Sequence, residues 1–155
     1  MDFYKHSFSK LFDVSEIVTI HYFEYGTDFV FPGESHDFWE FLCVDTGEVT
    51  VTADSNTYLL KKGDIIFHQP NQFHAVTTNG IVAPNLVVIS FVCHSPAMRF
   101  FENRIFPLKE RERNLLATII AEAPGAFSTP LNNPYTKGLD PASQQISGAE
   151  QMIQL

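Results

Sequence analysis

The sequence of 155 residues is poor in cysteine, in basic residues and in long apolar runs. Its 2 cysteines, Cys43 and Cys93, are too few for a disulfide framework, and we expect both to be free thiols within core strands. The most apolar stretch, residues 86–93, is far shorter than the roughly 20 residues that span a bilayer. The first residues also lack the basic and apolar regions of a signal peptide. We therefore predict a soluble, cytoplasmic protein without membrane contact.

Acidic residues outnumber basic ones, 18 to 10, which gives a formal net charge of −8. An acidic surface repels phosphate backbones, so this chain by itself is a poor candidate for binding nucleic acid. What the sequence does contain is apolar side chains, at 45%, among them 15 phenylalanines. This composition predicts one domain with a core, a pocket or an interface lined by aromatic rings.

Short alternating segments separated by turn residues fill the first two thirds of the chain. This spacing predicts an antiparallel β-sandwich or β-barrel of seven or eight strands. The expected strands are residues 16–25, 36–44, 48–53, 57–60, 65–68, 73–78 and 86–93. Residues 28–32 are expected to form an extended link, and residues 1–15 an arm that lies over the barrel. Within the segment 36–44, Trp39 is expected on the opposite face from His36 and Glu40, packed against helices.

The pattern changes to a helical one after about residue 95. Ser95 and Pro96 are typical of a helix start and predict a short helix over 97–104. A second helix is predicted over 109–123, ended by Pro124 and Gly125, with a connector over 124–146. Its apolar stripe packs either on the barrel or on a partner subunit, and we predict dimer contacts from Leu115, Leu116, Ile119 and Ile120.

A third helix is predicted at the end of the sequence. Residues 147–150 form a capping-box pattern, and an apolar stripe begins after it. The sequence stops about two turns later, and a helix this short is unstable alone. We therefore expect the native protein to continue beyond this chain.

Two histidine-containing runs carry the candidate chemistry. His36 and Glu40 are four residues apart on an extended segment, so their side chains point the same way, and Glu34 shares that face. His74, from the second run, can meet them across the barrel. Such a group could hold iron, manganese or zinc, could hydrogen-bond a polar small molecule, or could consist of side chains that only hydrogen-bond to one another.

The remaining histidines and one acidic residue receive simpler interpretations. His68 and His94 are predicted at the surface or at an edge, and the face of His21 is left open. Asp64 is interpreted as a turn residue.

The two runs resemble the two cupin motifs. The first is Glu34-x-His36-x3-Glu40-x6-Gly47, and the second is Gly63-Asp64-x5-Pro70-x3-His74. More narrowly, residues 15–95 resemble the N-terminal sensor domain of AraC-type transcriptional regulators, in which helices that mediate dimerisation follow the barrel. Two positions depart from the pattern. Glu34 stands where metal-dependent cupins have a histidine, and Asn71 stands where the pattern has a glycine. Asparagine also tolerates a left-handed backbone, so the turn can be kept.

The resemblance implies an all-β protein with C-terminal helices: a cupin-like double-stranded β-helix, or jelly-roll barrel, over residues 1–95, followed by a helical dimerisation segment over 96–155. It implies the effector-binding and dimerisation domain of a bacterial AraC-type regulator. Such a domain senses a small polar ligand, such as a sugar, and meets DNA only through a C-terminal domain outside this chain. Binding would shift the arm or the helices. The expected ligand contacts are Glu34, His36, Phe38, Glu40 and His74.

Two alternatives remain at this stage. The first is a small metal-dependent cupin enzyme, an oxygenase or isomerase, with Glu34, His36, Glu40 and His74 as metal ligands. The second is a stand-alone sugar-binding module. No catalytic residue and no cofactor is expected for the leading interpretation.

Overall fold

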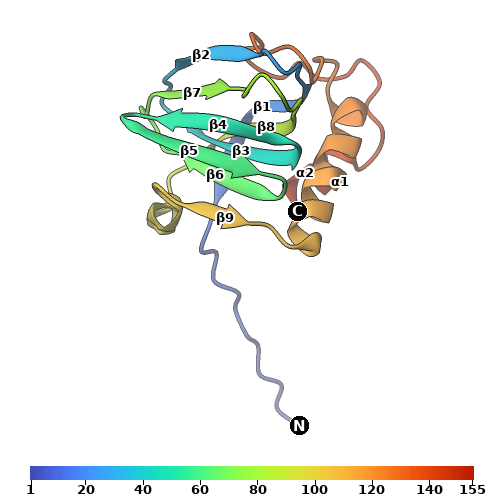
Figure 1. Ribbon diagram of the computed structural model, residues 1–155. Coiled ribbons are helices and arrows are strands. Elements are labelled where there is room, and N and C mark those ends of the chain that lie inside the picture. Colours follow the sequence, from blue (N-terminus) through green and yellow to red (C-terminus); the bar gives the residue numbers. More distant parts are fainter.

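The computed structural model describes residues 1–155 and contains two facing antiparallel sheets (Figure 1). One sheet has five strands in the order β1-β8-β3-β6-β9, and the other has four in the order β2-β7-β4-β5. The strands are β1 (Val14–Glu24), β2 (Val30–Glu34), β3 (Trp39–Thr46), β4 (Glu48–Ala53), β5 (Asn56–Lys61), β6 (Asp64–His68), β7 (His74–Thr77), β8 (Asn85–Cys93) and β9 (Ile105–Pro107). This arrangement confirms the predicted jelly-roll barrel.

The core lies between the two sheets and follows the predicted alternation of β3. Leu42 and Val44 are buried in the barrel interior, next to Glu40 on the same face. Cys43 and Trp39 point to the outer face, where Trp39 packs on Met98 of a short helix. Both faces of β3 are therefore covered, as its apolar sequence predicts. Cys43 and Cys93 are buried free thiols.

Strand β2 was not predicted, because Pro32 and Gly33 lie within it. Proline is tolerated here because β2 is an edge strand of its sheet. Gly33 has φ +112°, and a Cβ atom there would lie 2.3 Å from the ring of Phe73. Only glycine permits this close approach of β2 to β7, which places Glu34 opposite His74.

The predicted position of the N-terminal arm is wrong. Residues 1–12 are exposed along their whole length and extend away from the barrel (Figure 1). The contact that ends this segment is the backbone N–H of Asp13, which donates to Ser95 Oγ at 2.9 Å. Apart from Phe12, whose ring centroid lies 5.7 Å from that of Phe101, the arm does not pack on the rest of the chain.

The segment after β8 is less helical than predicted. A 3-10 helix, η1 (Pro96–Phe101), replaces the α-helix expected over 97–104, and the Ser95 side chain makes no cap bond to it. Strand β9 follows, antiparallel to β6, at Ile105, a β-branched residue that favours a strand. It adds a fifth strand to the sheet from within the segment predicted to be helical.

Helix α1 (Glu110–Ala126) continues through Pro124, where the prediction ended it. Pro124 has no N–H to donate to the carbonyl four residues earlier, and the connector after α1 stabilises the helix end in another way, by donating to carbonyls of the last turn. The N–H of Ile146 donates to Gly125 O, and the N–H of Ala142 donates to Ala126 O, both at 2.9 Å. Gly125 also packs closely on Ala149. Tertiary contacts therefore outweigh the helix-breaking tendency of proline.

The last helix, α2 (Ala149–Gln154), packs against α1. The predicted capping box does not form, because the N-cap is Gly148 in the left-handed conformation with φ +85°, without a side-chain cap bond. No helix of this chain has the length and hydrophobicity required to cross a bilayer.

The apolar stripe of α1 faces the outer side of the five-stranded sheet. Leu116, Ile119 and Ile120 are partly buried there and pack with the buried Ala123. Leu115 is 57% exposed. Three of the four residues predicted to carry dimer contacts therefore pack within the chain, and their role in dimerisation stays a prediction.

Candidate functional site

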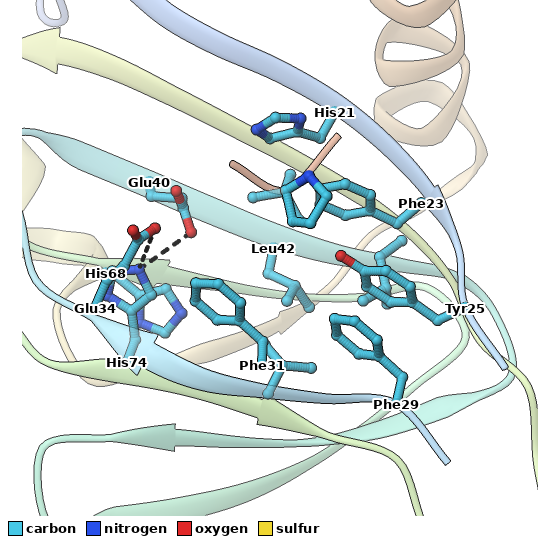
Figure 2. Close-up of a pocket in the computed structure, with 14 residues that line it drawn as sticks. His21, Phe23, Tyr25, Phe29, Phe31, Glu34, Glu40, Leu42, His68 and His74 are labelled. Carbon is cyan, nitrogen blue, oxygen red and sulfur yellow. Dashed lines mark ion pairs between the residues drawn. The ribbon is translucent and has the colours of Figure 1, made fainter. Parts of the chain in front are cut away.

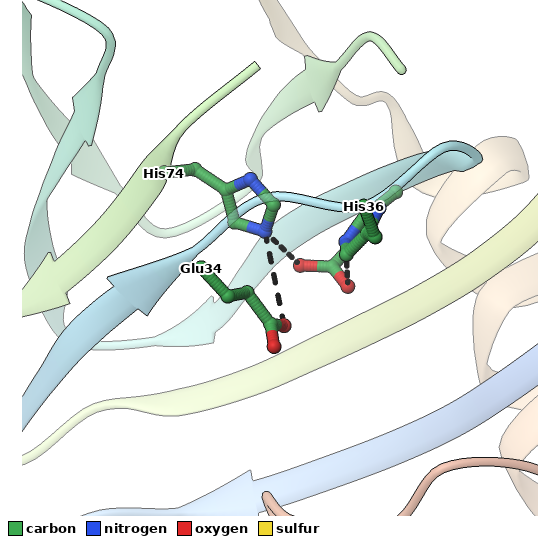
Figure 3. Close-up of side chains that lie close together, drawn as sticks. Glu34, His36 and His74 are labelled. Carbon is green, nitrogen blue, oxygen red and sulfur yellow. Dashed lines mark ion pairs between the residues drawn. The ribbon is translucent and has the colours of Figure 1, made fainter. Parts of the chain in front are cut away.

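Four predicted side chains meet at one end of the barrel interior (Figure 3). Glu34 comes from the end of β2, His36 from the following turn, Glu40 from β3 and His74 from the start of β7. One ligand atom of each lies within 4.8 Å of those of the others. The structure thus brings together residues that the sequence separates by as much as 40 positions, from Glu34 to His74.

Glu40 is the centre of this group. Its carboxylate lies 3.3 Å from His74 Nε2 and 3.5 Å from His36 Nε2, and accepts a hydrogen bond from Ser90 Oγ at 2.7 Å. Burial alone would raise the pKa of the Glu40 carboxyl, but the hydrogen bonds from His36, His74 and Ser90 lower it well below its ordinary value. Glu40 is therefore a buried carboxylate anion at neutral pH.

The two imidazoles are fixed by backbone carbonyls. His36 Nδ1 lies 3.0 Å from Phe38 O, and His74 Nδ1 lies 3.0 Å from Gln72 O. Because a carbonyl only accepts, each Nδ1 carries a hydrogen and each Nε2 is aimed at the carboxylates. The turn is closed by the N–H of Asn71, which donates to His36 O at 2.6 Å while Asn71 holds the expected left-handed backbone.

Burial and charge act in opposite directions on His74. Its burial would lower the pKa of the imidazole, but the hydrogen bond and charge of Glu40 outweigh this effect and raise that pKa above 6.5. The Glu34 carboxylate, at 4.0 Å and about half exposed, adds to the same effect from the mouth of the site.

This polar group forms one end of a pocket inside the barrel (Figure 2). The cavity has a volume of about 50 Å³. The whole space between the pocket walls, with the open mouth included, is about 490 Å³. The lining residues are His21, Phe23, Tyr25, Phe29, Phe31, Glu34, Glu40, Leu42, His68, His74, Val76, Leu86, Val88 and Pro134. The pocket is therefore narrow, polar at one end and aromatic at the other.

Two further histidines line this pocket. The prediction for His68 was wrong, and the sequence left the face of His21 open. His68, predicted at the surface or an edge, is 1% exposed and stacks on His74 with ring centroids 4.3 Å apart. Burial, followed by the charge of His74, lowers the pKa of His68 to about 3. His21 is also buried, and burial lowers its pKa. Strict alternation along β6 and β1 from known core residues would have placed both rings inside.

Two of the five predicted ligand contacts do not line the pocket. Phe38 stacks on the His36 ring at 3.9 Å, and both lie beside the pocket wall. His36 reaches the site through its contact with Glu40. Glu34, Glu40 and His74 line the pocket directly.

The four-residue cluster has the chemistry of a divalent metal site. Two imidazoles and two carboxylates suit iron, manganese or zinc. The backbone carbonyls fix the Nδ1–H tautomers, so the buried Nε2 atoms of His36 and His74, which face the Glu40 carboxylate, are the nitrogens that a metal ion would bind. The residues present therefore fit such an ion.

Comparison with known families agrees with this geometry. Residues 16–80 match the family model described as the AraC-like ligand binding domain. This segment is similar to the AraC-like ligand binding domain. It contains β1 to β7, and therefore both histidine-containing runs and most of the pocket wall. No protein with a curated description matches the sequence.

Solved cupins are among the structures to which this chain is similar at low identity. A cupin superfamily protein from Desulfitobacterium hafniense has a TM-score of 0.46 at 19% identity, covering 50% of this chain and 70% of that one. The Cnp3 cupin domain of Schizosaccharomyces pombe has a TM-score of 0.42 at 15% identity, covering 47% of this chain and 50% of that one. The DMSP lyase DddQ from Ruegeria pomeroyi has a TM-score of 0.41 at 19% identity, covering 59% and 43%. This chain thus spans half of the length of the Cnp3 domain.

Proposed function

We propose that this chain is the effector-binding and dimerisation part of a bacterial AraC-type transcriptional regulator. A small polar ligand, such as a sugar, enters the barrel and contacts Glu34, Glu40 and His74, and DNA is bound only by a further domain. The observation that carries this proposal is the pocket inside a barrel similar to the AraC-like ligand binding domain, polar at one end and lined by buried histidines.

The connector between α1 and α2 supplies a route from the pocket to the helices. Pro134 of the connector lines the pocket, and the carbonyl of Leu131 accepts the N–H of Tyr22 on β1 at 2.9 Å. The same connector closes the end of α1 and leads into α2. A ligand that binds one arrangement of this connector better than another would shift the helices.

The direct test is ligand binding by the purified chain. Calorimetric titration with a panel of monosaccharides and other hydroxylated metabolites should give one compound that binds in the wild type. The same compound should bind at least tenfold more weakly to Glu40→Gln, while Glu16→Gln, an exposed carboxylate on β1, leaves its affinity unchanged. Equal affinity in all three proteins would place the ligand outside the barrel and contradict the proposal.

The wider role has its own test. The reading frame around this chain should encode a basic helix-turn-helix segment, and the purified chain should sediment as a dimer. A frame without such a segment would contradict the regulatory role and leave ligand binding by the barrel intact.

A second candidate is a metal-dependent cupin enzyme, an oxygenase or isomerase. The observation that favours it is the cluster of Glu34, His36, Glu40 and His74, whose ligand atoms lie within 4.8 Å of one another. A divalent ion bound there would polarise a substrate oxygen or accept one as a ligand. Elemental analysis of the purified protein separates the candidates, since an enzyme of this class should contain stoichiometric iron, manganese or zinc that His36→Ala removes.

A further inference from the structure

The two ends of the pocket differ in chemistry (Figure 2). Glu34, Glu40 and His68 lie at one end. At the other, four rings form a continuous stack along one wall. Their centroid distances are 4.7 Å for His21–Phe23, 4.8 Å for Phe23–Tyr25 and 3.4 Å for Tyr25–Phe29. A ligand that fills the pocket therefore meets a polar surface at one end and aromatic rings at the other.

The polar end accepts hydrogen bonds and disfavours anions. Carboxylates such as Glu34 and Glu40 only accept hydrogen bonds, so a group placed between them must donate. Neither lysine nor arginine lines this pocket. The nearest cationic groups are imidazoles, and both His36 and His74 already face the Glu40 carboxylate. A carboxylate or phosphate on the ligand would thus meet two negative charges without a free cation to pair with.

His68 supplies a second, independent sign that a polar group belongs at this end. Its side chain is 1% exposed, and neither ring nitrogen has a hydrogen-bond partner. A buried polar atom left without a partner is unfavourable, and a ligand that provides the missing hydrogen bond removes that cost. One nitrogen of a neutral imidazole donates and the other accepts, which suits a hydroxyl or amino group.

The aromatic end sets the shape of the rest of the ligand. Phe31 and the stacked rings of Phe23 and Tyr25 line this end, and because each of the two stacked rings has a neighbour on both faces, they present their edges to the pocket. A flat-faced group packs on such ring edges in the edge-to-face arrangement that aromatic rings favour. The narrow free space, about 50 Å³ for water-sized groups, limits the ligand to a small molecule.

We infer that the effector is a small compound with a hydroxyl or amino head, a flat apolar face and no anionic group. The head donates to Glu34 and Glu40 and pairs with His68, while the flat face lies on the aromatic wall. This inference rests on the proposed function, because it defines the ligand class of the same pocket.

A matched set of probes tests the inference. We would titrate the 15N-labelled chain with 2-phenylethylamine, 2-phenylethanol and phenylacetate, which share one ring and differ in the head group, and with glucose. The amine and the alcohol should shift amide resonances of pocket strands at millimolar concentration. Phenylacetate should bind at least tenfold more weakly. His68→Phe, which keeps a ring in the stack, should weaken binding of the amine and the alcohol at least threefold.

The charge argument has its own variant. Glu34→Gln, at the half-exposed mouth, should reduce the preference for the amine over phenylacetate at least threefold, and Glu16→Gln should leave that preference unchanged. The spectrum of each variant without ligand shows directly whether it has folded.

The possible failures are distinct. If phenylacetate binds in the pocket as tightly as the amine, the exclusion of anions is wrong, and ligand binding by the barrel stands. If glucose shifts pocket resonances and the three phenyl compounds do not, the flat apolar face is wrong, and the proposed function again stands. If no probe shifts any pocket resonance, the inferred ligand class is wrong, and the proposed function is contradicted as well only when the metabolite panel described above also gives no binder.

Discussion

Replacing Glu40 by glutamine removes the charge on which the site is built. The carboxylate contacts His74 at 3.3 Å, His36 at 3.5 Å and Ser90 at 2.7 Å. A hydrogen bond to a charged group contributes about 1.5–3 kcal/mol, and removing one partner of a buried pair costs about 3–5 kcal/mol. Glutamine keeps the volume and one oxygen that can still accept from Ser90. We therefore expect the free energy of unfolding at pH 7 to fall by about 2–4 kcal/mol.

Urea unfolding measures this loss, with Glu16→Gln as the control. Glu16 is exposed on β1, and its substitution should change the free energy of unfolding by less than about 0.5 kcal/mol. The pH dependence gives a second check with a definite sign. The folded pKa of Glu40 is lowered, so its contribution to stability is present above the ordinary value of 4.5 and is lost as the pH falls. Glu40→Gln should lack this acid-side loss.

His74 reports the same interaction from the other partner. Its folded pKa is raised above 6.5, so its contribution is fully present below pH 6.5 and is lost as the pH rises through the folded value. Without the Glu40 carboxylate, burial dominates, and the pKa of His74 measured by NMR titration should drop. A stability loss under about 0.5 kcal/mol together with an unchanged His74 pKa would refute the view that Glu40 organises the site.

Further substitutions test the pocket wall, the turn and the helix. The His68 pKa is lowered from 6.5 to about 3, so the protein loses stability as the pH falls below 6.5. His68→Phe should reduce the loss between pH 7 and 4.5 by about 2 kcal/mol in urea unfolding, and an identical pH profile would contradict the burial of a neutral ring. Gly33→Ala should cost about 1–3 kcal/mol, because φ is positive and Phe73 lies in the way, whereas Gly138→Ala, with open space around it, should cost under about 0.5 kcal/mol. Leu115→Ser should leave unfolding unchanged within about 0.5 kcal/mol and weaken dimerisation in sedimentation experiments, while Ile119→Ser should destabilise the chain by about 1–3 kcal/mol. Equal losses for these two helix variants would show that the face of α1 is wrongly assigned.

The central strands were predictable because alternation and turns agree there. Strand β4 occupies residues 48–53, as expected, and β5, β6 and β8 differ from their predicted bounds by one residue at one or both ends. In β3, the same alternation correctly separated Glu40 and Leu42 from Trp39 and Cys43. A half-buried pleated strand leaves a period of two in its sequence, and this signal is strong when both neighbours are strands.

Elements decided by tertiary contacts were not predictable. Pro32 predicts the end of a strand when only its sequence neighbours are considered. Strand β2 forms nevertheless, because it pairs only with β7 and its outer edge needs no hydrogen-bond partner. Pro124 lies inside α1 because the connector binds the carbonyls at the helix end. Ser95 resembles an N-cap, but its hydroxyl accepts the N–H of Asp13 instead. Each case depends on a segment distant in sequence.

The candidate site was predicted in part. Local spacing placed Glu34, His36 and Glu40 together, and the second motif added His74. His68 was missed because a histidine at the end of a four-residue strand looks like an edge residue. Its burial follows from alternation along β6, because His68 shares the inner face of that strand with Ile66 of the core.

The position of Pro134 in the pocket wall matters for any redesign of this chain as a biosensor. Pro134 lines the pocket, and the connector that contains it also binds carbonyls at the C-terminal end of α1, so exchanging this connector to alter selectivity would loosen the helix end at the same time. Selectivity is better changed from the strands, for example at Phe31 on β2 or Val76 on β7, where a new side chain alters the pocket wall without touching the end of α1.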